Sequence, residues 1–281
     1  MMKQIKKNKV IKIATIILLF LSINLNAQSV DLELVNELVD NIKQGDLKSM
    51  KKLEAHLFGI ILEIVEPYDN NYKENTFLKT IEYVNKKINL NFNATNENGD
   101  TFLIAASRQG GLKIVKSLIG YGADVNAKDD EFGQTALTQA VNWDRLEIAK
   151  LLIDNGADIN ARGSGMFGNP PLIIGVINYM DYSPLPYYEY SEILEKIKFL
   201  IDKGADVNVK DNIGRSVLEK TIDMLNIQHW ELVLEIVKLL VDNGANINAK
   251  DKNGNTALTY AKRKGNKGKE IVKFLMSRGA K

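Results

Sequence analysis

Apolar residues recur at spacings of three and four positions in five separate stretches of the 281-residue chain. The stretches are LKIVKSLIGYG from Leu112, LEIAKLLIDNG from Leu146, LEKIKFLIDKG from Leu194, LEIVKLLVDNG from Leu234 and KEIVKFLMSRG from Lys269. This spacing gathers apolar side chains on one face of a helix, and the closing glycine is typical of the left-handed residue that follows a helix. The pattern predicts five helices, with Leu151 and Leu239 on the buried faces of two of them.

A second pattern alternates with the first, in which a glycine turn and a hydroxyl residue precede a short apolar run. Its copies are NGDTFLIAA from Asn98, FGQTALTQA from Phe132, FGNPPLIIG from Phe167, IGRSVLEKT from Ile213 and NGNTALTYA from Asn253. A hydroxyl at this place accepts a hydrogen bond from the first turn of a helix, which predicts N-caps at Thr101, Thr135, Ser216 and Thr256. The third copy has Pro170 there, so Asn169 is expected to cap the helix, with Pro170 as its first residue.

A third string lies between the two patterns. It reads GADVNAK from Gly122, GADINAR from Gly156, GADVNVK from Gly204 and GANINAK from Gly244, and the chain ends in RGAK. In this order the three patterns resemble the ankyrin repeat, a turn and two antiparallel helices of about 33 residues. The resemblance covers residues 96–281 as five units: 96–128, 129–163, 164–210, 211–250 and 251–281. No unit has the histidine of the family's Thr-Pro-Leu-His segment.

The resemblance implies an all-α solenoid of helix-turn-helix units with short β-hairpin turns. It also implies that the protein binds other proteins and has no catalytic activity. Upstream, NLNFNATNENGDT from Asn89 aligns with GANINAKDKNGNT from Gly244, and residues 31–66 and 72–88 have helical patterns. Because a terminal unit of a solenoid must present one face to water, residues 28–95 are expected to form a divergent helical N-terminal cap.

The first 27 residues differ from the rest. Five lysines precede an apolar run from Ile13 to Leu21, and Ala27 follows at a position suited to cleavage. This order predicts a secretory signal peptide and therefore a periplasmic or secreted protein, although Leu25 departs from the usual A-x-A pattern and an uncleaved N-terminal anchor is the alternative. The run is shorter than the roughly 20 apolar residues of a membrane span. The abundance of lysine, asparagine and isoleucine points to a bacterial source.

Removal of the signal changes the charge. The remaining chain has 32 basic and 35 acidic residues, which gives a net charge of −3. Such a chain offers no overall basic face for nucleic acid. We expect a protein partner, no membrane contact after cleavage, and a monomer.

Candidate chemistry is sparse. The sequence has no cysteine, and its two histidines, His56 and His229, lie far apart in the order of units. This excludes disulfides and thiol chemistry and leaves no assembled nucleophile, base or metal pair, so we expect no enzyme activity, metal or cofactor. The segments NENGDT and DKNGNT superficially resemble calcium loops, but their glycine spacing and missing glutamate favour β-turns.

Length differences between units point to one edge of the solenoid. From the capping position to the second helix, the chain takes 13 residues in units one and two, 26 in unit three, 20 in unit four and 15 in unit five. Both tryptophans and five of the ten tyrosines lie in the inter-helix turns of units two to four, and these residue types often anchor interfaces. Tyr187 and Tyr190 have helical spacing with Leu194 and are expected to be core residues.

These observations define the candidate partner-binding residues. On the inter-helix edge they are Trp143, Tyr182, Leu185, Tyr188, His229 and Trp230, and at the hairpin tips they are Asp129, Asp130, Glu131 and Phe167. For the two tryptophans, burial is as compatible with the sequence as exposure. An acidic run such as 129–131 is more often a solvated surface than a partner contact.

The sequence therefore predicts a non-catalytic protein-binding module that acts in the periplasm or outside the cell. One alternative is a secreted effector or inhibitor that docks on a foreign protein. An alternative of another class is an enzyme or metal protein with its site in residues 28–95.

Overall fold

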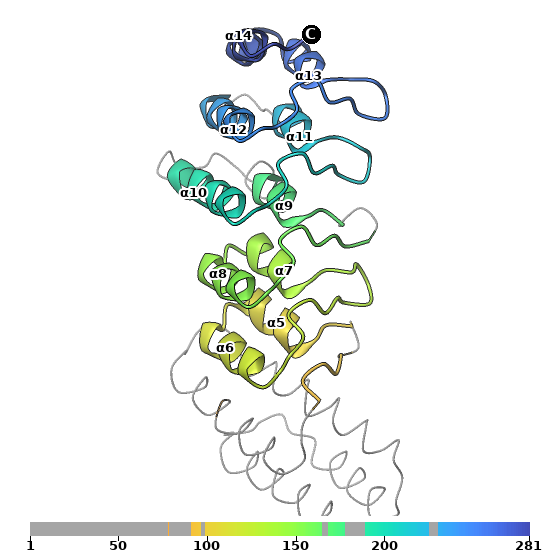
Figure 1. Ribbon diagram of the computed structural model, residues 1–281, viewed down its shortest axis with the longest axis vertical. Coiled ribbons are helices and arrows are strands. Elements are labelled where there is room, and N and C mark those ends of the chain that lie inside the picture. The colour runs from red at the N-terminus through yellow and green to blue at the C-terminus, as the bar shows by residue number, and fades with distance from the viewer. Residues whose placement is uncertain (1–77, 79–90, 97–98, 165–167, 178–188, 225–229) are drawn as a thin grey trace, which may run out of the picture.

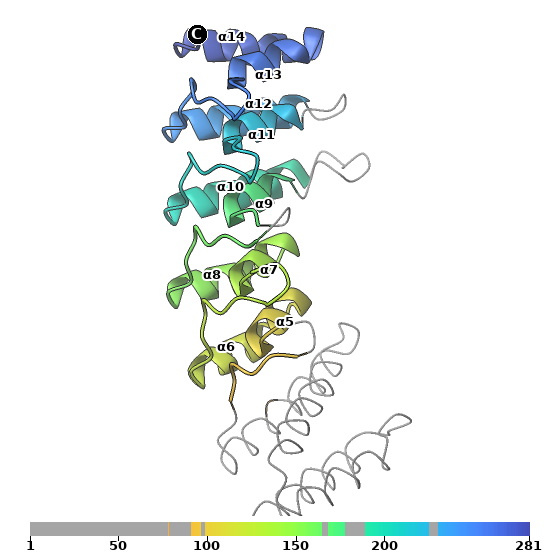
Figure 2. The ribbon, with the colours of Figure 1, turned by 90° about the vertical axis from the view of Figure 1, so that its right-hand side faces the viewer.

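The computed structural model describes residues 78, 91–96, 99–164, 168–177, 189–224 and 230–281. Within this part the helices form five successive pairs. The pairs are α5 (Phe102–Gln109) with α6 (Leu112–Gly120), α7 (Ala136–Asn142) with α8 (Leu146–Asp154), α9 (Pro171–Ile177) with α10 (Glu189–Asp202), α11 (Val217–Asp223) with α12 (Trp230–Asp242), and α13 (Ala257–Arg263) with α14 (Lys269–Ser277). Figures 1 and 2 show the pairs stacked in single file, with the first helices in one column and the second helices in another. The predicted all-α solenoid is confirmed for the described part.

Hydroxyl side chains start the first helices as predicted. Thr101 accepts a hydrogen bond from the Ile104 amide at 3.3 Å, and equivalent bonds cap α7, α11 and α13. In unit three, however, the helix begins at Pro171, and the Pro170 carbonyl accepts the Ile174 amide at 3.1 Å. The prediction of Asn169 as cap is therefore wrong by one position. The second proline takes the first helical position, where no N–H is needed.

The second helices end as the glycine pattern predicts. After α6, Gly122 has a φ of 87°, and the amides of Gly122 and Ala123 bond back to the carbonyls of Ile119 and Leu118. Gly156, Gly204, Gly244 and Gly279 also have positive φ. A residue with a side chain would be strained in this left-handed conformation, and the returning bonds satisfy carbonyls that the helix leaves free.

Short hairpins connect one pair to the next. Single antiparallel bridges join Thr95 to Thr101, Lys128 to Thr135 and Lys210 to Ser216. In Figure 1 the hairpins project away from the second helices. The connections between pairs have nearly constant length, whereas those within a pair differ in length. Unit one has only Gly110–Gly111 between its helices, while unit three has residues 178–188 and unit four has residues 224–229. The added length thus lies between the two helices of a unit, as expected.

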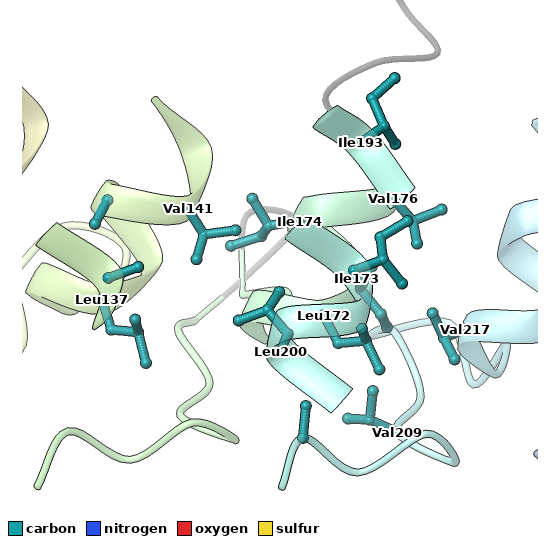
Figure 3. Close-up of a cluster of buried hydrophobic side chains, with 14 of the residues drawn as sticks. Leu137, Val141, Leu172, Ile173, Ile174, Val176, Ile193, Leu200, Val209 and Val217 are labelled. Carbon is teal, nitrogen blue, oxygen red and sulfur yellow. The ribbon is translucent and has the colours of Figure 1, made fainter. Parts of the chain in front are cut away.

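The core is a continuous column centred on the first helices. Leu172, Ile173 and Val176 of α9 are almost completely buried, and α9 packs against α7 and α11 of the neighbouring units as well as α10 of its own. Figure 3 shows these side chains between Leu137 of α7 and Val217 of α11. Each unit therefore completes the core of its neighbours.

The buried faces of the second helices differ from the prediction by one residue. Leu151 and Leu239 are only partly buried, whereas their neighbours Leu152 and Leu240 have no exposed surface. Two consecutive leucines fit the apolar periodicity almost equally well. The choice between them depends on how each helix is rotated against the first helices, which is a tertiary property.

A row of asparagines joins each repeat to the next. Asn126 accepts a hydrogen bond from the Asp158 amide at 2.7 Å and donates one to the Gly156 carbonyl at 3.0 Å. Asn208 makes the same two bonds to Asn246 and Gly244. Asn248 bonds to Gly279 and Lys281 in the same way, and Asn93 and Asn160 each accept the equivalent backbone amide. We call this row the asparagine ladder; it explains why asparagine recurs in the string GADVNAK.

We predict that Leu152→Ala and Leu240→Ala each lower the free energy of unfolding by about 2–5 kcal/mol, because each leaves a cavity in the column. Urea denaturation followed by circular dichroism measures the change. Leu151→Ala, which removes the same atoms from a partly buried position, is the matched control and should cost clearly less. Equal costs for Leu151 and Leu152 would contradict the assigned orientation of α8.

Asn208→Ala should lower the free energy of unfolding by about 1–2 kcal/mol, since it removes two hydrogen bonds between units four and three. The same denaturation experiment tests this. Asn253→Ala is the control, because Asn253 is exposed and uses only its backbone amide in the hairpin. The ladder would lose its assigned role if the two variants unfolded alike.

Candidate partner-binding groove

A groove of about 440 Å³ lies where the hairpin between α6 and α7 meets the first helices of units one and two. Its walls come from α5, α7 and the hairpin. They consist of Asp100, Arg108, Asp129, Glu131, Phe132, Gln134, Gln139, Asn142 and Trp143. Three of the residues predicted from the sequence, Trp143, Asp129 and Glu131, are thus brought together, although they were assigned to two different surfaces.

Trp143 forms one wall of this groove. It directly follows Asn142, the last residue of α7, and 52% of its surface is exposed. Its indole N–H donates to Oε1 of Gln139 at 3.2 Å, one turn earlier on the same helix. The bond orients the ring without burying it. An oriented, exposed tryptophan next to a concave surface has the properties of an interface anchor.

Polar side chains under Trp143 form a connected network. Gln139 is buried, and its side-chain oxygen Oε1 also accepts a hydrogen bond from Nε of Arg108 at 3.3 Å. Arg108 in turn forms an ion pair with Asp100 at 2.8 Å. The side-chain Nε2 group of Gln139 donates a hydrogen bond to Oε1 of Gln134. These contacts hold the floor of the groove in one arrangement before any partner arrives, which lowers the entropic cost of binding.

The acidic run at the hairpin tip divides into two parts. Asp129 is only 7% exposed, and its carboxylate accepts the Phe132 amide at 2.6 Å. Asp211 and Asp251 make the equivalent bonds in units four and five. Asp129 therefore shapes the turn, and its role as a partner contact stays a prediction. Asp130 and Glu131 are exposed and stay candidates.

Trp230 differs from Trp143. It is the first residue of α12, is partly buried, and packs against the hydrophobic core. Of the burial and exposure that the sequence left open, Trp230 is thus partly buried, and its role as a partner contact stays a prediction. Of the remaining candidates, Phe167, Tyr182, Leu185, Tyr188 and His229 lie outside the described residues, as do Tyr187 and the side chain of Tyr190, and all of these stay predictions.

Six lining residues were not predicted from the sequence. They are Asp100, Arg108, Phe132, Gln134, Gln139 and Asn142. A signal for part of this set exists. The residue before the N-cap bonds to a residue eight positions later in Asp100–Arg108, Arg215–Asp223 and Asn255–Arg263. Alignment of the units would have identified this pair of positions as one surface whose chemistry changes from unit to unit.

An ion pair ties the turn beside Trp143 to the next unit. Asp144 has a left-handed backbone with a φ of 59°, and its carboxylate bonds to Nζ of Lys196 from α10. Lys196 is almost completely buried. Burial lowers the pKa of Lys196, and the bond and charge of Asp144 offset part of that effect. The turn that carries Trp143 is thus anchored in unit three.

No cluster of three or more histidine, cysteine or acidic side chains with the geometry of a metal site occurs in the part of the chain that the structure describes. None of the helices described combines the length and apolarity that crossing a membrane requires.

Stacked helix pairs with projecting hairpins define a solenoid of helix-turn-helix repeats. A family model for ankyrin repeats in three copies matches residues 70–163 and 190–281, about two thirds of the chain. The chain belongs to the ankyrin-repeat family. The first match begins within the segment expected to form the divergent cap, and the unmatched residues between the two matches include the long insertion of unit three. No curated protein matches the chain significantly.

The turn aspartates lead to a prediction on pH. Asn255, the Tyr260 hydroxyl and two backbone amides donate to Asp251, and these bonds, with that of the Asn255 side chain the strongest, lower the pKa of Asp251 to about 2. Burial and the same carboxylate raise the pKa of Tyr260 to about 12. Because the pKa of Asp251 is lower in the folded chain, its contribution to stability is present above about pH 4 and is lost as the pH falls through 2.

We therefore expect Asp251→Asn to be less stable than the wild type at pH 6, with the difference shrinking as the pH falls from 4 to 2. Chemical denaturation at several pH values measures it. Asp202→Asn, at an exposed position on α10, is the control and should show little difference at any of these values. A gap between Asp251→Asn and wild type that stays constant down to pH 2 would contradict the assigned bonds.

Proposed function

We propose that the protein is a non-catalytic binding module that holds a protein partner in the groove around Trp143. The ankyrin-repeat family generally mediates protein–protein interactions, which supports the class of function. The observation that carries the assignment to this surface is the exposed indole of Trp143, held by Gln139 beside a concave wall. No cofactor takes part in this function, and a monomer suffices for it.

The lining of the groove fits a polypeptide segment. The rings of Trp143 and Phe132 offer apolar contact for a side chain of the partner. The side chains of Gln134 and Asn142 add polar amide groups to the wall beside these rings. Glu131 is exposed at the rim and suits a basic side chain. The partner segment is therefore expected to combine an apolar or aromatic anchor with a nearby lysine or arginine.

We further propose that binding takes place in the periplasm or outside the cell. The lysine-rich and apolar residues before Ala27 support this location. Detection of the chain in the envelope or the medium of producing cells, with an N-terminus at Gln28, is the matching experiment. A full-length chain that stays in the cytoplasm would exclude it.

Trp143→Ala is predicted to weaken partner binding about tenfold or more while leaving the melting temperature nearly unchanged, because an exposed anchor contributes more to binding than to folding. The partner is first captured from the native envelope or medium with the wild-type chain and identified by mass spectrometry. Isothermal titration with the purified partner then measures the affinity of each variant.

Met276→Ala is the matched control, since Met276 is 58% exposed but lies on α14, three units away from the groove. It should bind like the wild type. If Trp143→Ala lowered the melting temperature strongly and left the affinity unchanged, Trp143 would be a packing residue and the proposed surface would be wrong.

A further inference from the structure

Charge is distributed unevenly along the chain. The last unit, residues 251–281, has nine basic and two acidic residues, whereas residues 28–250 have 23 basic and 33 acidic ones. The small net charge therefore conceals a strongly basic end. A solvent-exposed surface needs polar residues for solubility, but interspersed charges of both signs meet that need. The excess of one sign requires a further explanation.

Five of these basic residues lie in one turn. They are Lys262, Arg263, Lys264, Lys267 and Lys269, at the end of α13, in the 3₁₀ helix η2 (Gly265–Gly268) and at the start of α14. We call residues 262–269 the basic turn. Because α13 and α14 both pack against η2 and helices pack 8–10 Å apart, the five cations share a surface about 10–15 Å across.

No carboxylate of the described residues pairs with the basic turn. Arg263 donates to the amide oxygen of Asn255 at 2.8 Å and lies over the Tyr260 ring, and Lys264 donates to the backbone carbonyl of Asp223. Both contacts position a cation without neutralising it. By contrast, the cations further along α14 are compensated: Lys273 pairs with Glu270 at 2.7 Å and Arg278 with Asp242 at 2.9 Å.

We propose that the basic turn binds a run of acidic residues in the protein partner. This inference rests on the proposed function and adds the chemistry of a second contact. An extended segment advances about 3.3 Å per residue, so about three to five residues span the turn. Residues 28–250, with 33 acidic and 23 basic residues, disfavour a polyanion, so the basic turn is the part of the sequence that suits one.

The lining of the turn distinguishes a polypeptide from other polyanions. Between Ala261 and Ile271 the sequence is KRKGNKGKE, without an apolar or aromatic side chain. Single-stranded nucleic acid is held by aromatic stacking, and surface-bound helices insert apolar residues into a membrane. Met276, the exposed apolar side chain of this unit, lies near the other end of α14. The basic turn therefore offers a partner charge complementarity without apolar or aromatic contact, and acidic side chains of a polypeptide can bind in this way.

The two contacts have a defined separation. Lys264 follows α13 directly as Trp143 follows α7, so the two residues occupy equivalent places three units apart. At 8–10 Å per unit they are about 25–30 Å apart. A partner that uses both would carry its acidic run about nine or more extended residues from the anchor in the groove.

The test measures binding of a fluorescein-labelled octaglutamate peptide to the purified chain by fluorescence anisotropy at 20 mM and 150 mM salt. We expect K262Q/K269Q to bind about fivefold more weakly than wild type at low salt, as for the loss of two exposed ion pairs. K273Q/R278Q removes the same charge from the same unit but only from compensated cations, and should change the affinity less than twofold. Circular dichroism confirms that both variants fold.

Three outcomes would overturn the inference: no binding of octaglutamate, equal losses in the two double variants, or tighter Lys262- and Lys269-dependent binding to anionic phospholipid vesicles or oligothymidine. Trp143→Ala should bind octaglutamate like the wild type. If the partner requires Trp143 but octaglutamate does not bind, the acidic run is wrong and the proposed function is retained. If octaglutamate binds to the basic turn but the partner binds Trp143→Ala as well as the wild type, the groove is wrong instead.

Discussion

The architecture depends on hydrogen bonds between an asparagine side chain in one repeat and the backbone of the next. Apolar contacts between helices favour burial but tolerate sliding, whereas an amide that both accepts and donates fits one position of the neighbouring turn. Asn126 illustrates this, because its oxygen takes the Asp158 N–H while its NH₂ group reaches the Gly156 carbonyl. Neither aspartate, which cannot donate when ionised, nor leucine could replace it. The ladder thus sets the spacing of the hairpins, and with it the spacing of every surface built on them.

Because the ladder lies at the base of the hairpins, the adjoining positions are free to differ between units. The bonded pair that flanks each N-cap is acidic then basic in unit one, basic then acidic in unit four, and asparagine with arginine in unit five. The geometry is constant and the chemistry changes. The groove and the basic turn both use positions that vary between units. The groove, in units one and two, is lined by aromatic and amide side chains, and the basic turn, in unit five, carries cations.

Features that depend on local chemistry could be predicted from the sequence. A hydroxyl before an apolar run identified the N-caps, and a glycine after an amphipathic stripe identified the helix ends, because each acts within a few residues of its position. Features that depend on contacts between units could not. Choosing between Leu151 and Leu152, or recognising that Trp230 packs inward, requires knowing how a helix meets its neighbour. The groove itself rests on the bond from Arg108 to Gln139, 31 residues apart, and no local pattern reports such a contact.

The described bonds of the ladder involve the connections between helix pairs and the residues after α14, whereas the connections within a pair are the segments whose length varies, from Gly110–Gly111 to 178–188. Closing a flexible loop becomes costlier only with the logarithm of its length, by about 0.6 kcal/mol for each doubling. Growth from two residues to eleven is about two and a half doublings, so it costs about 1.5 kcal/mol, which is of the same order as the loss of one capping hydroxyl. Lengthening by insertion along this edge is therefore thermodynamically affordable. The connection between the two helices of a unit is therefore a site where residues can be inserted, in evolution or by design, while the repeat is retained.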